Sequence, residues 1–308
     1  MRYLVTGAAG QVGRYLTALL QQLGHDVVAF DRAFATPAPE QTVAGDLCDP
    51  AAISDLLADG RFDGLFHLAG LNALQPAGDI QRVNVGGTVN LLAAMSQLGA
   101  NAPRLILMSS SAVYGRSSDD PITETTCLDP QTPYAASKAA AEEAALRYHA
   151  ASGQDVRIAR PFNIVGPGQR APLLYAKVAA LLVEIERAKR PPMLELGNLD
   201  SYRDFVDVRD VCTGLVAIAE QGQSAEVYNL CSGQATLIHS MVDALCAQAA
   251  LRVEIRTQPR GATDVPYQRG SHAKLSALSG WRPQVTLDQS LRDTLTYWRD
   301  IAGSGNSD

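Results

Sequence analysis

The stretch Tyr3-Leu-Val-Thr-Gly-Ala-Ala-Gly-Gln-Val-Gly13 joins an apolar run to a turn with three regularly spaced glycines, and an amphipathic run follows to about Leu23. The pattern predicts a buried strand over Tyr3–Thr6 and then a helix. Glycines permit a tight bend and close backbone approach, and the helix N-terminus then faces a pyrophosphate. A glycine triplet alone also fits an ordinary turn, but its place between strand and helix predicts dinucleotide binding in an α/β fold.

The composition is that of an ordinary globular protein. The 308 residues, 46% hydrophobic and 19% charged, suffice for one large domain or two lobes. The net charge of −6 argues against a nucleic-acid or anionic-membrane partner, and no apolar run has the length of a membrane span. The chain starts as a strand rather than a signal peptide, and its five scattered cysteines lack a Cys-x-x-Cys pair. We therefore expect reduced thiols, no metal site and a cytoplasmic location.

The second predicted strand, Asp26–Phe30, ends at Asp31 and Arg32. An acidic side chain at this strand tip accepts hydrogen bonds from the adenosine ribose hydroxyls and repels a 2′-phosphate, which favours NAD(H). The Arg32 guanidinium can accept that phosphate, so NADP(H) remains possible.

Two further strand ends also point to a dinucleotide. After the short strand Val43–Gly45, Asp46 can meet an adenine amino group or cap the helix Pro50–Leu57. The buried strand at 64–67 opens into small residues that let a cofactor approach the backbone. We interpret His67 as a packed strand residue rather than a catalyst.

The strand Arg104–Met108 ends in the turn Ser109-Ser-Ser-Ala-Val-Tyr-Gly115, and an alanine-rich helix is expected from Tyr134 to about Tyr148. Ligands in such sheets bind beyond the carboxyl ends of strands, so Ser110 is placed to hold a reacting oxygen. Tyr134 and Lys138 lie one helical turn apart on one face, although the pair alone would also fit an exposed helix. A nearby ammonium favours the phenolate, so we expect the pKa of Tyr134 to fall, as a general acid or base requires.

Proline and glycine residues at 161–168 follow the sixth strand, Val156–Ala159, and indicate a boundary. The sequence therefore predicts a Rossmann-type doubly wound parallel sheet over residues 1–162, with returns at about 203–231. A smaller C-terminal α/β lobe, mainly residues 163–308, is expected to bind the substrate.

Arginines in this second lobe are candidate phosphate ligands. Arg203 can clamp a diphosphate with its planar guanidinium, or form a salt bridge with Asp204 or Asp207. Arg260 is a second candidate, and Gly303–Asp308 is expected to be a disordered tail.

Several motifs follow one another in the order of a known family: the glycine turn, Asp31, Asp46-Leu47, His67-Leu-Ala, Asn84-Val-x-Gly-Thr, Ser-Ser-x-x-Val-Tyr-Gly115, Tyr134-x-x-x-Lys138 and Arg160-Pro-Phe-Asn163. Together they resemble the extended short-chain dehydrogenases/reductases, the nucleotide-sugar epimerase/dehydratase group. The resemblance implies a seven-stranded Rossmann sheet, a nucleotide-sugar substrate and a homodimer formed through helices at about 80–98 and 134–151.

The resemblance also implies roles for individual residues. Tyr134 would exchange a proton with the sugar oxygen, Lys138 would lower the Tyr134 pKa and bind the nicotinamide ribose, and Ser110 would hold the same oxygen. The implied cofactor-binding residues are Gly7, Gly10, Gln11, Val12, Gly13, Asp31, Arg32, Asp46, Leu47, Leu68, Ala69, Tyr134, Lys138 and Pro161. The implied substrate-binding residues are Ser111, Asn163, Arg203 and Arg260.

Within the family, segments 183–192, 197–204 and 228–233 are similar to the GDP-sugar branch. This similarity implies reduction, with NAD(P)H, of the C4 keto group of a GDP-4-keto-6-deoxy-hexose to a GDP-D-rhamnose-type product. Dehydratases of the family carry a glutamate at the position of Ala112, so its absence argues against dehydration. The alternative is a UDP- or GDP-hexose 4-epimerase that retains NAD. A non-catalytic dinucleotide sensor is disfavoured because Tyr134 and Lys138 are both present.

Overall fold

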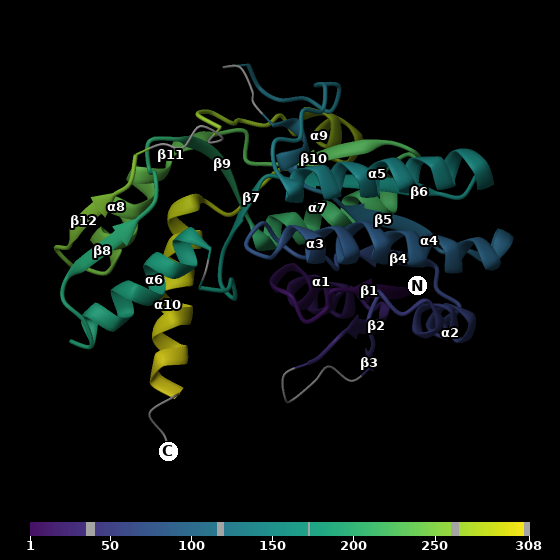
Figure 1. Ribbon diagram of the computed structural model, residues 1–308, viewed down its shortest axis with the longest axis horizontal. Helices are drawn as coiled ribbons and strands as arrows, with labels where there is room; N and C mark the ends of the chain where they lie inside the picture. The colour runs from purple at the N-terminus through teal and green to yellow at the C-terminus, as the bar shows by residue number, and fades with distance from the viewer. Residues whose placement is uncertain (35–40, 116–119, 172, 260–264, 305–308) are drawn as a thin grey trace.

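The computed structural model describes residues 1–34, 41–115, 120–171, 173–259 and 265–304, which form two lobes side by side (Figure 1). The larger lobe is built on a seven-stranded parallel sheet in the order β10-β6-β5-β4-β1-β2-β3. This confirms the predicted Rossmann-type fold. Its strands are β1 (Arg2–Thr6), β2 (Asp26–Asp31), β3 (Thr42–Ala44), β4 (Gly64–His67), β5 (Arg104–Met108), β6 (Val156–Pro161) and β10 (Val227–Leu230).

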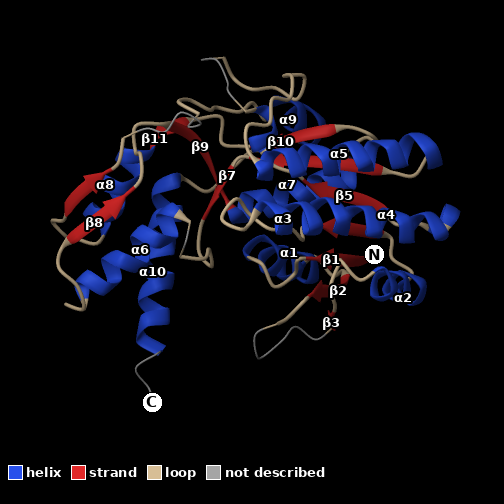
Figure 2. Ribbon diagram, in the orientation of Figure 1, coloured by secondary structure: helices blue, strands red, loops and turns tan. Residues whose placement is uncertain are grey.

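Helices cover both faces of this sheet (Figure 2), which explains why its central strands are almost uninterrupted apolar runs. One buried cluster joins Leu16 and Leu215 to one face, and another joins Leu91 and Ala145 to the opposite face. The helices of this lobe are α1 (Gln11–Gln22), α2 (Pro50–Gly60), α3 (Ala77–Ile80), α4 (Gly87–Gln97), α5 (Pro133–Ser152), α7 (Val208–Gln221) and α9 (Ala273–Ser279), with a π-helical segment at Gln81–Gly86 and 3₁₀ turns at Gly99–Asn101 and Ser111–Tyr114.

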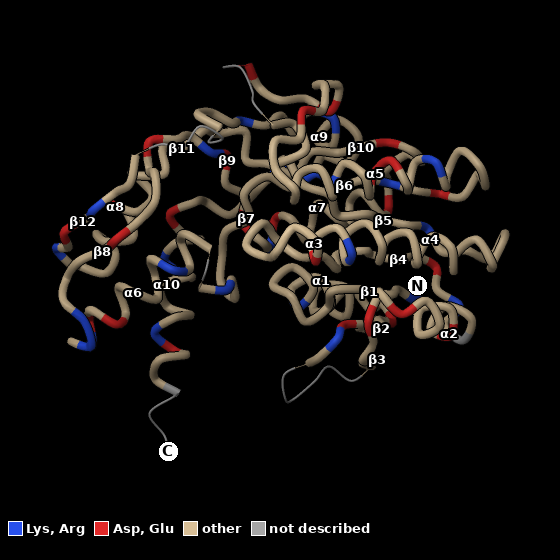
Figure 3. Tube along the Cα trace, in the orientation of Figure 1, with Lys and Arg blue, Asp and Glu red and all other residues tan. Residues whose placement is uncertain are grey.

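The smaller lobe packs three helices against two short sheets around its own apolar core. Its helices are α6 (Leu174–Glu186), α8 (Ile238–Gln248) and α10 (Leu287–Ser304), and its strands are β7 (Asn163–Val165), β8 (Met193–Leu196), β9 (Tyr202–Asp207), β11 (Ala235–Leu237) and β12 (Glu254–Thr257). Acidic and basic residues are interspersed over both lobes (Figure 3).

The connections place the cleft between the lobes. Strand order reverses between β1 and β4, so their carboxyl ends leave a crevice where ligands bind in such sheets. Strand β9 pairs with β7 and β11 in the smaller lobe, whereas α7 packs on α1 and β10 pairs with β6. The chain therefore returns to the large sheet through α7 and β10 and then re-enters the smaller lobe at β11.

Some expected element ends were wrong. Asp49, not Asp46, caps α2, because its carboxylate accepts hydrogen bonds from the backbone N–H groups of Ala51 and Ala52. Helix α10 continues through Ser304, so Gly303 and Ser304 are not part of the expected tail, and residues 305–308 lie outside the described residues.

All five cysteines carry free thiols, as expected. Among the described residues, no three His, Cys, Asp or Glu side chains gather closely enough to hold a metal ion. None of the helices in the described part of the chain combines the length and hydrophobicity that crossing a bilayer requires.

Candidate active site

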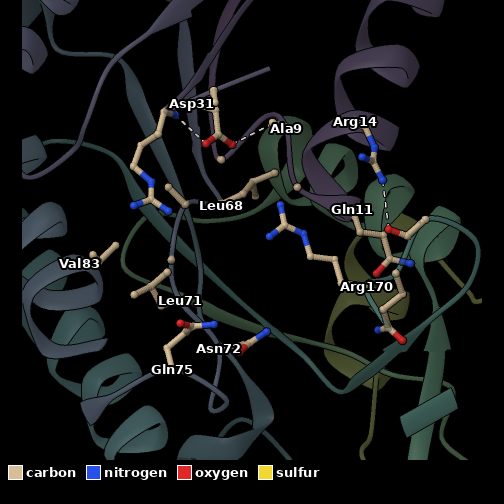
Figure 4. Close-up of a pocket in the computed structure, with 18 of the residues that line it drawn as sticks. Ala9, Gln11, Arg14, Asp31, Leu68, Leu71, Asn72, Gln75, Val83 and Arg170 are labelled. Atoms are coloured by element: carbon tan, nitrogen blue, oxygen red, sulfur yellow. Dashed lines mark hydrogen bonds between the residues drawn. The ribbon is translucent and has the colours of Figure 1, made fainter. Parts of the chain in front are cut away.

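A cleft of about 750 Å³ lies at the carboxyl ends of β1, β2 and β4 (Figure 4). The first lobe contributes the glycine turn, the tip of β2 and the turn after β4. The second lobe contributes the segment 168–171 together with Leu173, Tyr297 and Trp298. The cleft therefore has walls from both lobes and a volume within the range of small-molecule and cofactor sites.

The glycine turn is tightly packed at two positions. Gly7 has φ of +72°, and a Cβ there would lie 2.6 Å from the Ala69 nitrogen. A Cβ at Gly13 would lie 2.2 Å from the Gly7 carbonyl oxygen. Side chains at either position would push the turn away from α1 and from the β4 turn. The first N–H groups of α1 face the cleft here, so the backbone fits the pyrophosphate of a dinucleotide.

The Asp31 carboxylate lies at the β2 end of the cleft. It accepts hydrogen bonds from the Ala9 N–H at 2.9 Å and from the Arg32 N–H at 2.7 Å. Asp31 therefore holds the glycine turn as well as lining the cleft.

The structure divides the predicted cofactor residues into two groups. Five do not line the cleft: Val12, Gly13, Tyr134, Lys138 and Pro161. Of these, Val12, Gly13 and Pro161 are buried, so only their backbone or packing can contribute. Those that line the cleft are Gly7, Gly10, Gln11, Asp31, Arg32, Asp46, Leu47, Leu68 and Ala69.

Tyr134 lies in the first turn of α5, which Thr132 caps by accepting a hydrogen bond from the Ala135 N–H. Ser110, which follows β5, lies near enough to the Tyr134 hydroxyl to lower its pKa. Lys138, one turn further, is buried and donates from Nζ to the Met108 carbonyl oxygen at 3.0 Å. Strand β5 and helix α5 thus bring the predicted catalytic side chains together.

Asn84 links this group to the cleft. Its side chain exchanges two hydrogen bonds with the Leu71 backbone and donates to Ser137 Oγ at 2.9 Å. It therefore fixes the turn after β4 against α5.

The expected fall in the Tyr134 pKa was wrong for the protein alone. Burial raises the pKa of Tyr134, and the hydrogen bond with Ser110 opposes this only in part. Burial also lowers the pKa of Lys138 to about 8, although the nearby Glu142 carboxylate raises it. Desolvation disfavours both charged forms, so the phenol holds its proton.

His67 is a packed residue, as interpreted from the sequence. Its ring nitrogens contact Thr6 Oγ1 at 2.8 Å and Thr88 Oγ1 at 3.0 Å. Burial lowers the pKa of His67 to about 3, so the ring is neutral.

Three predicted substrate residues are described by the structure, and none of them lines this cleft. Ser111 is buried, and its carbonyl oxygen accepts a hydrogen bond from Gln268. Asn163 donates to the Asp204 carbonyl oxygen, which ties β7 to β9. Arg203 is half-buried on β9. Arg260 lies outside the described residues.

The alternative partners of Arg203 are engaged elsewhere. The Asp207 carboxylate accepts from Arg209 at 2.8 Å. The buried Asp204 carboxylate accepts from Ser232, Gly233 and Gly270. Arg203 itself donates from Nη1 to the Tyr202 carbonyl oxygen at 2.8 Å.

Sequence reasoning missed several residues of the cleft wall. Arg170 follows the stretch Gly166-Pro-Gly-Gln169, part of which the sequence indicated only as a boundary, and Trp298 belongs to α10. Both line the cleft. Trp298 also packs against the second-lobe core, and no local pattern distinguishes that position from a purely buried one.

Comparison with known proteins agrees with this geometry. The sequence model of the NAD dependent epimerase/dehydratase family matches residues 3–231. The chain is 35% identical to the GDP-6-deoxy-D-mannose reductase of Pseudomonas aeruginosa over 96% of its own length and 97% of that protein.

Two solved structures extend the comparison. RMD from Pseudomonas aeruginosa complexed with NADPH matches with a TM-score of 0.86 and 34% identity, over 97% of this chain and 99% of that one. UDP-glucose 4-epimerase of Thermus thermophilus in complex with NAD matches with a TM-score of 0.87 and 28% identity, over the same shares of the two chains.

Proposed function

The chain belongs to the NAD dependent epimerase/dehydratase family, and from that premise we propose that it reduces the C4 keto group of a GDP-4-keto-6-deoxy-hexose. The observation that carries the proposal is that Ser110, Tyr134 and Lys138 come together next to Gly70, a residue that lines a cleft fitting a dinucleotide. The 35% identity to a GDP-6-deoxy-D-mannose reductase favours the GDP-linked substrate and a GDP-D-rhamnose-type product.

The protein contributes positioning and proton transfer. A bound reduced nicotinamide supplies the hydride to C4. Ser110 holds the C4 oxygen by a hydrogen bond while Tyr134 donates its proton to it. The raised pKa of Tyr134 suits this direction, because a reductase needs the phenol protonated at the start. Lys138, one turn away, lies where its ammonium would stabilise the phenolate that remains.

The substrate phosphates would be held from the second lobe. Asn163 and Arg203 lie on neighbouring strands, and we assign the substrate diphosphate to Arg203 with Arg260 as a further ligand. Ser111, the neighbour of Ser110 in the chain, would also contribute to substrate binding.

A 4-epimerase is the second candidate function. The fold match to a UDP-glucose 4-epimerase favours it, and the same Ser110, Tyr134 and Lys138 would serve that reaction. An epimerase keeps its NAD through each cycle, whereas a reductase must release the oxidised cofactor.

One assay separates these two functions. The purified protein receives a freshly made GDP-4-keto-6-deoxy-hexose with NADPH or NADH, and nicotinamide oxidation and sugar product are measured together. We expect one nicotinamide oxidised per sugar reduced. Interconversion of UDP-glucose and UDP-galactose without added cofactor would instead establish the epimerase. Calorimetric titration with GDP and with UDP reports the nucleotide preference independently of turnover.

The Lys138 pKa predicts a pH-dependent cofactor affinity. The ammonium predominates below pH of about 8 and is lost above it. We propose that it donates to the nicotinamide ribose, so NADPH affinity should fall about tenfold from pH 7 to about pH 9. Titration of NADPH by fluorescence measures this. In the Lys138→Met variant the affinity should be low and flat over this range, and an unchanged slope would contradict the role.

Asp31 and Arg32 lead us to propose that the protein accepts both cofactors. Asp31 receives the ribose hydroxyls of NADH, and Arg32 receives the 2′-phosphate of NADPH. The Arg32→Ala variant should bind NADPH about tenfold more weakly and NADH unchanged, because only NADPH has the phosphate. Calorimetry with each cofactor tests this, and an equal loss for both would reject the assignment.

We also propose a homodimer through α4 and α5. A groove beside α5 is lined by the apolar Leu128, Ala139, Leu146 and Ala150 and by the charged Glu142, Glu143, Arg147 and Arg160. On α4, Val89 is 47% exposed. Light scattering after size exclusion tests the oligomeric state.

A further inference from the structure

We propose that Arg170, carried by the second lobe, clamps the pyrophosphate of the dinucleotide against the glycine turn of the first lobe. Its side chain lines the cleft and points into it (Figure 4). No hydrogen bond or ion pair joins its guanidinium to another residue in the described part of the chain. Within the described residues it is therefore an unpaired cation in the wall of a cleft that fits an anionic cofactor.

The loop that carries Arg170 is fastened to the start of α1. Gln11 Nε2 donates to the carbonyl oxygens of Gly166 at 2.8 Å and Pro167 at 3.0 Å. Arg14 donates to the Gly168 carbonyl oxygen at 3.1 Å. Gln11 and Arg14 belong to the first turn of the helix whose N-terminus faces the pyrophosphate, so the loop cannot move independently of that turn.

The residue before Arg170 fixes the loop from the other side. Gln169 is 5% exposed and donates from Nε2 to the Ile164 carbonyl oxygen at 2.9 Å and to the Tyr175 hydroxyl at 3.0 Å. The loop also needs Gly168, with φ of +82°, where a Cβ would lie 2.8 Å from Arg14. With Gln169 pointing into the lobe, Arg170 is directed outward into the cleft.

The hydrogen bonds from Gln11 and Arg14 indicate that Arg170 binds the cofactor pyrophosphate rather than the 2′-phosphate or the substrate diphosphate. Arg170 is held above α1 and the glycine turn, whereas Arg32 lies at the β2 tip, where a 2′-phosphate would bind. The three bonds from Gln11 and Arg14 tie Arg170 to the cofactor side of the cleft rather than to β9, which carries Arg203. A guanidinium bridges two phosphate oxygens in a fixed planar geometry, and the free N–H groups of α1 approach from the opposite side.

The inference rests on dinucleotide binding by the family and not on the sugar substrate. Its test therefore measures the affinity for the cofactor rather than turnover. The Arg170→Ala variant is titrated calorimetrically with NADH, NADPH and GDP, and its thermal unfolding is recorded. We expect the dissociation constants of NADH and NADPH to rise by the same factor, about tenfold, with GDP binding and unfolding unchanged. Arg170→Lys should recover part of the loss, because a point charge replaces the planar fork.

The matched control is Arg256→Ala, which removes an exposed arginine that pairs with Glu254 on β12. It should leave all three affinities unchanged. Weaker binding of NADPH alone would move Arg170 to the 2′-phosphate, and weaker binding of GDP alone would move it to the substrate. Either result, or unchanged cofactor affinity, overturns the proposal.

Discussion

Replacing Tyr134 with Phe is expected to lower kcat by about a hundredfold to ten-thousandfold while the protein still binds NAD(P)H. The substitution removes the hydroxyl that lies near Ser110 and keeps the ring that fills its place on α5. Without the phenolic proton the developing alkoxide at C4 has no acid, and general acid catalysis contributes rate factors of this order. Steady-state reduction of the keto sugar measures kcat, and calorimetric titration with the cofactor measures its binding.

Two variants make this result specific. Ser110→Ala should lose less, because the proton donor remains and only one hydrogen bond to the oxygen disappears. Tyr148→Phe removes a hydroxyl from the same helix with no hydrogen-bond partner in the described part of the chain and should retain full activity. Full turnover by the Tyr134→Phe variant would reject Tyr134 as the acid.

The Arg160→Met variant should lose about 3–5 kcal/mol of unfolding free energy. Arg160 and Glu142 are 5% and 2% exposed, and the guanidinium donates to the Glu142 carboxylate at 2.9 and 2.5 Å. It also donates to the Tyr114 hydroxyl at 2.9 Å. Removing the guanidinium leaves the carboxylate buried without its partner, which costs more than the pair contributes. Denaturant unfolding followed by circular dichroism measures the change.

An exposed ion pair on another helix provides a control for the Arg160→Met variant. Arg292 pairs with Asp288 four residues earlier on α10, but their side chains are 54% and 62% exposed. Arg292→Ala should therefore change stability by about 0.5 kcal/mol or less. Adding Glu142→Leu to Arg160→Met should recover stability, since no buried charge is then left unpaired. If Arg160→Met costs no more than Arg292→Ala, the buried pair is not a major contribution.

The sequence by itself determined the local elements. Alternation of apolar runs and helical patterns predicted the strands and helices of the large sheet, because a doubly covered parallel strand must be apolar along its whole length. The glycine spacing predicted the close approach at Gly7 and Gly13, since only glycine lacks the Cβ that would clash there. The four-residue spacing of Tyr134 and Lys138 placed both on one face, and Ser110, predicted from its place after the strand Arg104–Met108, lies near Tyr134.

Only the tertiary structure decided the electrostatics and the second wall of the cleft. The sequence suggested a lowered Tyr134 pKa from one neighbouring charge, whereas burial by distant segments raises it. Nothing in the sequence predicted that the loop of Arg170 lies beside Gln11. The hydrogen bond that joins Gln11 to Gly166 of this loop connects residues 155 positions apart. A local sequence pattern determines which backbone conformations one segment can adopt. Desolvation of a side chain and contacts between lobes depend instead on how distant segments pack, and residue spacing within one segment does not contain this information.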